Sequence, residues 1–127
     1  MSKKFLVVSA VVSALLFASN AQADGKFTLG RTLLLEHGKH AAKIPLLVCR
    51  NTNAIQIKAE KGLELRKAVV KFQNGESKTI NFYRDFDKDE HSSWRYFGKR
   101  RCVKSINVYG NSESSKAGVR VYGKEKN

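Results

Sequence analysis

The sequence is poor in acidic residues, and it has one proline, one tryptophan and two cysteines. Its 127 residues include 11 Asp and Glu against 24 Lys and Arg, a formal net charge of +13. A chain of this length holds one domain and leaves no room for a second catalytic domain. Because 42% of the residues are apolar and 28% are charged, the composition is globular and excludes a disordered or fibrous chain.

The only long uncharged apolar run lies at the start of the chain. Lys3 and Lys4 precede the apolar residues 5–17, and the small-x-small sequence A-Q-A follows at residues 21–23. These three regions predict a signal peptide, residues 1–23, cleaved after Ala23. Thirteen apolar residues are short for a bilayer core, which needs roughly 20. The mature chain, residues 24–127, loses two lysines and no acid, so its net charge is +11. We therefore expect a periplasmic or secreted protein.

The two cysteines are predicted to form one disulfide, because an exported pair is usually oxidised. A Cys49–Cys102 bridge closes a loop of about 54 residues, which is worth about 4 kcal/mol in the chain-entropy model. A reactive thiol would need a C-x-x-C spacing or a nearby histidine, and only His40 lies within ten residues. Strand alternation aligns Cys49 with Leu47 and Cys102 with Ile106, so both thiols are expected to point into one core.

Alternation of apolar and polar residues, with period two, is the dominant pattern of the mature chain. Asn74-Gly75 between two alternating runs predicts a tight hairpin turn. The resulting fold class is all-β, a single antiparallel β-sandwich of jelly-roll or immunoglobulin-like layout over residues 24–127. Its seven or eight short strands are expected at residues 27–35, 44–50, 55–58, 63–73, 76–83, 93–97, 102–109 and 118–123.

An acidic run at residues 85–90 has the D-x-D-x-D spacing of a calcium loop. Glu90 stands where such a loop needs glycine, and Tyr96 stands where it needs a bidentate glutamate. A solvated loop is therefore the preferred interpretation.

The three histidines, His37, His40 and His91, could share a metal ion, but no carboxylate pattern accompanies them. Exposed loop histidines explain them better. There is no G-x-S-x-G motif, and the serines cluster in turn-like segments. We expect no catalytic residue, no metal and no cofactor.

Basic and aromatic residues are interleaved between residues 94 and 104. Such a surface can stack rings on bases or sugars while its cations pair with anionic groups. Arg66, Lys67 and Lys71 form a second basic group on another predicted strand. The alternative is a solvated face that only resists aggregation. The candidate ligand-binding residues are Trp94, Arg95, Tyr96, Lys99, Arg100, Arg101 and Lys104.

Three segments resemble a known family. They are I-P-L-L-V-C-R at residues 44–50, I-Q-I at residues 55–57, and K-R-R-C-V-K-S-I at residues 99–106 followed by Gly110. They are similar to the YaaI-like family, small exported bacterial proteins with a domain of unknown function. The resemblance covers residues 29–122 in layout. It implies a periplasmic, β-rich domain with one disulfide in a Gram-negative source. The family carries no established activity, so no site is transferred.

These observations predict an exported, non-catalytic binding module rather than an enzyme. Its partner would be anionic: an envelope polysaccharide, lipopolysaccharide, nucleic acid or an acidic protein surface. One alternative is a periplasmic inhibitor or envelope-stress accessory protein whose disulfide-braced loop enters a partner's cleft. Another is a small metal-dependent hydrolase that uses Asp85, Asp87, Asp89 or His91.

Overall fold

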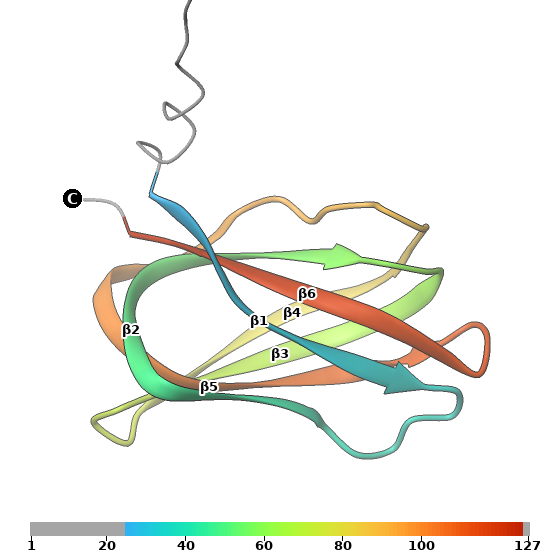
Figure 1. Cartoon of the computed structure of the whole chain (residues 1–127), viewed down its shortest axis with the longest axis horizontal. Coiled ribbons are helices and arrows are strands. Elements are labelled where there is room, and N and C mark those ends of the chain that lie inside the picture. Colours follow the sequence, from blue (N-terminus) through green and yellow to red (C-terminus); the bar gives the residue numbers. More distant parts are fainter. Residues whose placement is uncertain (1–24, 126–127) are drawn as a thin grey trace, which may run out of the picture.

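The computed structural model describes residues 25–125, and all regular secondary structure in this range is β-strand (Figure 1). The strands are β1 (Lys26–Leu35), β2 (Ala42–Ala59), β3 (Leu63–Phe72), β4 (Ser77–Phe86), β5 (Arg95–Ser112) and β6 (Lys116–Lys124). They form one antiparallel sheet in the order β1-β6-β2-β5-β3-β4. The predicted all-β antiparallel fold is confirmed. The predicted signal peptide, residues 1–23, lies outside the described residues.

Six long strands replace the seven or eight short ones expected, because two pairs of predicted strands are continuous. Residues 44–50 and 55–58 both belong to β2, while residues 93–97 and 102–109 fall largely within β5. Strands β2 and β5 each contain a four-residue bulge. Residues 46–49, the β2 bulge, lie opposite Lys104 alone, and residues 97–100, the β5 bulge, lie opposite Asn53 alone. The bulges interrupt the alternation, which made one strand look like two.

The sheet folds over on itself where β2 and β5 bend (Figure 1). The C-terminal half of β2 pairs with β6, whereas its N-terminal half pairs with the C-terminal half of β5. Strand β1 pairs with β6, yet it lies across the other half of β2, since a Cβ on Gly30 would collide with Ile44. The pairing therefore shows one folded sheet and not two separate sheets. Corners of this kind form where strands pass from one layer to the next through bulges.

Two layers enclose the core. The first layer contains β1, β6 and the C-terminal half of β2; the second contains β3, β4, the N-terminal half of β2 and the C-terminal half of β5. Inward positions such as Ile57, Val70, Val108 and Val121 are fully buried. Their sequence neighbours point outward, so each layer presents one polar outer face to solvent.

The β3–β4 hairpin turns at the predicted Asn74-Gly75. Its loop has three residues, 73–75, because the Phe72 amide donates to the Glu76 carbonyl over 2.9 Å. Only Gly75 has a positive φ, at 92°, as expected when glycine takes the left-handed position of a three-residue hairpin loop. No helix within residues 25–125 is long and apolar enough to span a bilayer.

Candidate functional site

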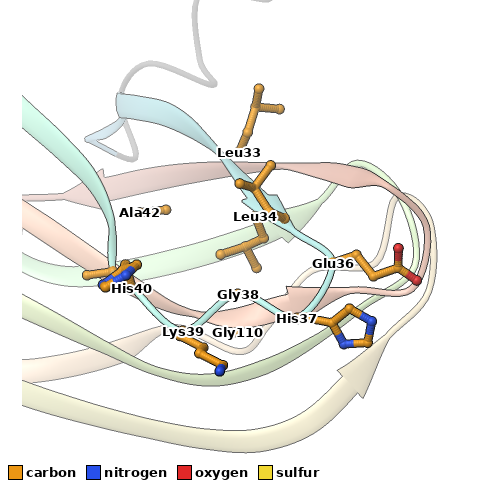
Figure 2. A pocket seen from close by; sticks show the side chains of 11 residues that line it. Leu33, Leu34, Glu36, His37, Gly38, Lys39, His40, Ala42 and Gly110 are labelled. Carbon is orange, nitrogen blue, oxygen red and sulfur yellow. The ribbon is translucent and has the colours of Figure 1, made fainter.

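The connection between β1 and β2, residues 36–41, covers a pocket of about 300 Å³ (Figure 2). Leu34 and Ala42 line its apolar part. His37 and His40 lie at opposite ends of the connection and do not approach each other. The third histidine, His91, lies elsewhere, paired with Lys58 in an isolated bridge. Within the described range no group of His, Cys, Asp or Glu is arranged to hold a metal ion.

The acidic run divides between two places. Glu90 accepts hydrogen bonds from the Asp87 amide over 2.9 Å and from Arg84, and these two donors lower the pKa of its carboxyl, the amide having the larger effect. Asp89 lies 3.9 Å from Lys58 Nζ. Asp85 instead pairs with Glu64 across β3 and β4 and lines a pocket with it. Glu90 and Asp89 therefore connect the loop to Arg84 and Lys58.

An acidic pocket of about 380 Å³ lies at the end of the fold where β3 and β6 begin and β1, β4 and β5 end. Four of the chain's 11 carboxylates line it. They are Glu36, Glu64, Asp85 and Glu113.

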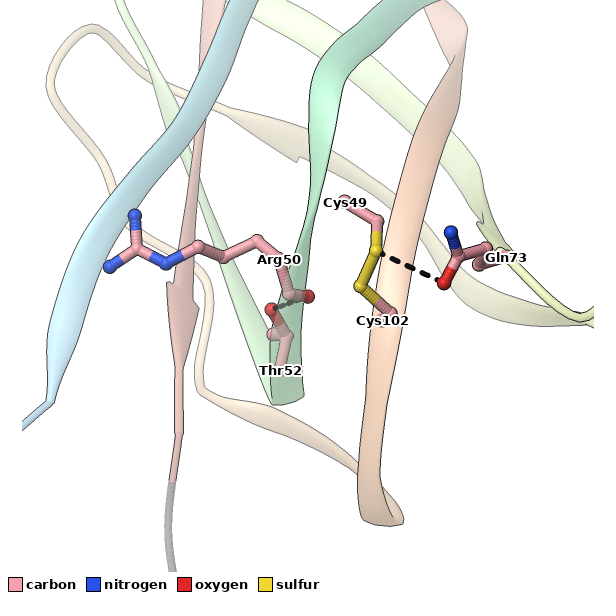
Figure 3. The surroundings of a disulfide bond; sticks show 5 residues. All are labelled: Cys49, Arg50, Thr52, Gln73 and Cys102. Carbon is pink, nitrogen blue, oxygen red and sulfur yellow. Dashed lines mark hydrogen bonds between the residues drawn. A yellow bond between two sulfur atoms is a disulfide. The ribbon is translucent and has the colours of Figure 1, made fainter.

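The Cys49–Cys102 disulfide is present in the structure, with its Cα atoms 5.1 Å apart (Figure 3). Both cysteines are half-buried, and Gln73 Oε1 lies 3.4 Å from Cys49 Sγ. The expectation that both thiols point into the core is wrong. Cys49 belongs to the β2 bulge together with Leu47, which is exposed rather than buried, and β5 carries an extra residue, Lys104, relative to β3, so Cys102 does not share a side with Ile106. The bridge therefore lies outside the hydrophobic cluster.

The outer face of the first layer brings two of the predicted aromatic residues together with residues from β1 and β6. One row crosses four strands through the pairs Lys26↔Lys124, Lys124↔Ala54 and Ala54↔Tyr96. Lys124 Nζ lies 4.7 Å from the ring centre of Trp94, just before β5, and Lys26 Nζ lies 4.3 Å from that of Tyr122. We call this surface the aromatic face; its residues are Lys26, Trp94, Tyr96, Tyr122 and Lys124.

A second row of cations borders the aromatic face. It runs through Arg31, Arg120 and Lys58 to His91. The His91 ring stacks on Tyr122 with 6.3 Å between ring centres.

Glu60 neutralises part of this row. Arg31 donates to both of its carboxylate oxygens over 2.7–2.9 Å, and Arg120 lies 3.5 Å away. The hydrogen bonds from Arg31 are the main cause that lowers the pKa of Glu60. With Asp89 beside Lys58, the face and its border hold two carboxylates against five Lys and Arg side chains.

The predicted basic residues Lys99 and Arg100 occupy the β5 bulge, where Gly98 adopts a φ of 96°. Both side chains are exposed. Arg100 Nη1 lies 2.6 Å from Glu125 Oε2, directly after Lys124, which places Arg100 at the rim of the aromatic face. Lys99, Arg100 and Arg101 also line a pocket of about 310 Å³ beside the hairpin loop.

Arg95 and Arg101 point instead towards rings of the core. The Arg95 guanidinium lies 4.5 Å from the ring centre of Phe82 and donates to the Asn81 carbonyl over 2.9 Å. The Arg101 guanidinium lies 4.8 Å from the ring centre of Phe72, and Arg101 Nη1 lies 3.2 Å from Glu76 Oε1. Both arginines cover apolar rings, so they are structural in part.

Lys104 lies apart from the aromatic face, on the outer face of the second layer. It shares that surface with Lys43, Lys67 and Lys71, and we call these four residues the lysine face. The predicted residues therefore divide among the aromatic face, the core covers and the lysine face. Tyr122 and Lys124 did not appear among them, although their alternation with Val121 and Gly123 in the sequence shows that they share one side of a strand.

The fold and its surface define a small, disulfide-braced β-sheet domain with cationic outer faces. The DUF2541 family, described as a domain of unknown function, matches residues 7–123, and the chain belongs to this family. No curated protein and no solved structure matches the chain.

Proposed function

We propose that the protein is an exported, non-catalytic module that binds an anionic polymer of the envelope or extracellular space through its aromatic face. The proposal rests on one observation: residues paired across neighbouring strands bring aromatic rings and cations together on this face. Three aromatic rings, those of Trp94, Tyr96 and Tyr122, share one outward surface with two lysines and a bordering row of cations. Rings and cations on one surface suit a polymer that carries both stackable rings and negative charge.

The lysines above the rings suggest how such a polymer would bind. Lys124 now lies on Trp94, and Lys26 lies on Tyr122. A flexible lysine can leave the ring to meet an anionic group, which uncovers the ring for stacking. The two-residue repeat along β6 places Tyr122 and Lys124 on one side of the strand, where an extended chain can reach both. An acidic or sulfated polysaccharide fits this description, and single-stranded nucleic acid is the competing ligand in the test.

Export and kinship belong to the same proposal. It includes a signal peptide cleaved after Ala23, release into the periplasm or the medium, and kinship with the YaaI-like proteins within the wider family. Mass spectrometry of the protein recovered from a periplasmic extract is expected to show Asp24 as the first residue. An N-terminus at Met1 would contradict export by cleavage.

Binding is tested with heparin as the sulfated polymer, dextran as the neutral one, and single-stranded DNA. Tyr122→Ala is expected to weaken heparin binding about tenfold, because a stacked ring contributes roughly 1–3 kcal/mol. Lys124→Gln is expected to weaken binding and to flatten its dependence on salt. Trp94 is the single tryptophan, so its fluorescence is expected to change as Lys124 leaves the ring.

Matched controls come from the same fold. Tyr109 carries a similar lysine cover, with Lys67 Nζ 5.0 Å from its ring centre, but lies on the second layer. Lys116 lies at the other end of β6. Tyr109→Ala and Lys116→Gln are expected to bind heparin like the wild type. Equal losses in the two lysine variants with no loss in either tyrosine variant, or unchanged binding in all four variants, would show that only the overall charge attracts the polymer. Tighter binding of DNA than of heparin would assign the face to nucleic acid.

A further inference from the structure

The β2 bulge projects two adjacent aliphatic side chains into solvent. Leu47 has a relative exposure of 105% and Val48 of 81%, the two highest among the large hydrophobic residues exposed in the described part of the chain. Lone exposed aliphatic residues are common on proteins, but two neighbours at the tip of a protrusion form a contact point.

The bulge is held in place on both sides. Pro45 pairs with Ser105 before it, and Arg50 pairs with Val103 after it. Cys49, the last residue of the bulge, is joined to β5 through the disulfide with Cys102. The exposure of Leu47 and Val48 is therefore built into the fold at a fixed position.

Cations surround the bulge on the lysine face. Lys104 lies directly opposite it, Lys71 pairs with Ser105 in the row that contains Pro45, and Lys43 precedes it in β2. Strands β2 and β5 contain no Asp or Glu, and of their eight Lys and Arg residues Lys43 and Lys104 belong to the lysine face.

The acidic pocket lies at the other end of the molecule. Glu64 stands near the start of β3, while the bulge lies beside the end of the same strand. Strand β3 has ten residues, so its two ends lie roughly 30 Å apart. The charge distribution thus orients the bulge end towards an anionic surface and the acidic end away from it.

We infer that the β2 bulge is a peripheral anchor that inserts Leu47 and Val48 into the surface of an anionic lipid bilayer. Lys43, Lys71 and Lys104 then lie at the level of the headgroup phosphates. Paired aliphatic and cationic groups are the combination that binds proteins to such surfaces, because apolar burial and electrostatic attraction act together. The three lysines beside the bulge favour anionic lipid over an apolar protein partner. This anchor is separate from the aromatic face, so either can fail without the other.

Cosedimentation with vesicles tests the anchor, using phosphatidylglycerol mixed with phosphatidylcholine against phosphatidylcholine alone. The wild type is expected to bind only the mixed vesicles. Leu47→Ser combined with Val48→Ser is expected to lose at least about tenfold in affinity, and Lys104→Gln about fivefold. Because all three side chains are exposed, these variants are expected to unfold at the wild-type temperature. The controls Leu35→Ser and Lys88→Gln, which replace exposed residues away from the bulge, and Tyr122→Ala, on the aromatic face, are expected to bind vesicles normally.

Insertion itself is read from a tryptophan at the tip. Leu47→Trp in a Trp94→Phe background is expected to show a blue-shifted emission with the mixed vesicles, while Trp94 of the wild type keeps its emission. No shift at position 47, or a shift of Trp94 alone, would overturn the inference. So would a wild-type dimer that Leu47→Ser with Val48→Ser converts to a monomer without any change in vesicle binding, because the bulge would then contact a second copy of the chain.

Discussion

Removal of the disulfide is expected to destabilise the fold strongly, because the bridge holds the short segment between the two bulges. Only three residue pairs, Arg50↔Val103, Asn51↔Cys102 and Thr52↔Arg101, connect β2 to β5 there. The bridge spans 53 positions, so it closes a loop of about 54 residues. A loop of this length restricts the unfolded chain by about 14 cal/mol/K, or about 4 kcal/mol at 25 °C.

The 101 residues from 25 to 125 have an unfolding entropy of about 2 cal/mol/K per residue. Dividing the lost stability of about 4 kcal/mol by this entropy gives a fall of roughly 20 °C in Tm. The assay is urea and thermal unfolding, followed by circular dichroism, of the oxidised wild type and of Cys49→Ser combined with Cys102→Ser. Reduction of the wild type is expected to reproduce the double variant, which separates loss of the bond from the effect of serine. Oxidised and disulfide-free proteins that unfold within about 1 kcal/mol of each other would refute this reasoning, since the bridge would then restrict nothing in the unfolded chain.

Three further predictions concern packing and charge. Gly110→Ala is expected to cost about 1–3 kcal/mol in urea unfolding, because the added Cβ would collide with the Glu64 carbonyl and lie 3.1 Å from a Leu34 methyl; wild-type stability would contradict the close approach of the strands. Phe86→Ala is expected to cost about 3–5 kcal/mol, as its ring is buried and packs edge-on to Phe82; a loss below about 1 kcal/mol would show that this end of the core is loosely packed. Glu60→Gln is expected to flatten the acid side of the stability curve. Because the folded pKa of Glu60 lies below its ordinary value of 4.5, the stability due to its charge is present above that value and is lost as the pH falls through the lowered pKa. The wild type is therefore expected to lose more stability than the variant below pH 4.5; identical acid limbs would show that Glu60 contributes nothing.

The strand content could be predicted from the sequence because buried and exposed residues alternate over most of each strand. One such run lies in β6, where Val119, Val121 and Gly123 are buried and Arg120 and Tyr122 are half-buried. The hairpin at Gly75 was equally local. The bulges were not, because four residues opposite one can be recognised only when both strands are aligned, and this offset changes which residues of the two strands share a side. The extra residue Lys104 in β5 explains why Cys102 does not point into the core with Ile106.

The candidate site was predicted only in part, for a related reason. Trp94 and Tyr96 are close in sequence, but Lys26 and Lys124 reach them through pairings that join the two ends of the described chain. Arg95 is adjacent to both aromatic residues in the sequence and points to the other side of the sheet, towards Phe82. Basic residues that are consecutive in a strand cannot all share a face, so a run of charge in the sequence overstates the patch that it forms.

The two outer faces suit the two proposed activities, because they lie on different layers. The proposed anchor holds the β2 bulge against a lipid surface, while the aromatic face on the other layer remains available to a polymer. The disulfide includes Cys49 of the bulge and joins β2 to β5 there. Loss of the bridge is therefore expected to weaken vesicle binding as well as stability.

The most direct test of the proposed function is a map of the backbone amide shifts when the oxidised protein is titrated with a heparin oligosaccharide. The account predicts that the largest changes fall on the aromatic face, at Trp94, Tyr96, Tyr122 and Lys124, and on Gln56, which pairs with Tyr122, and that they persist at raised salt. Changes centred on the lysine face, or weak changes at every exposed cation that vanish as salt rises, would contradict a binding site on the aromatic face.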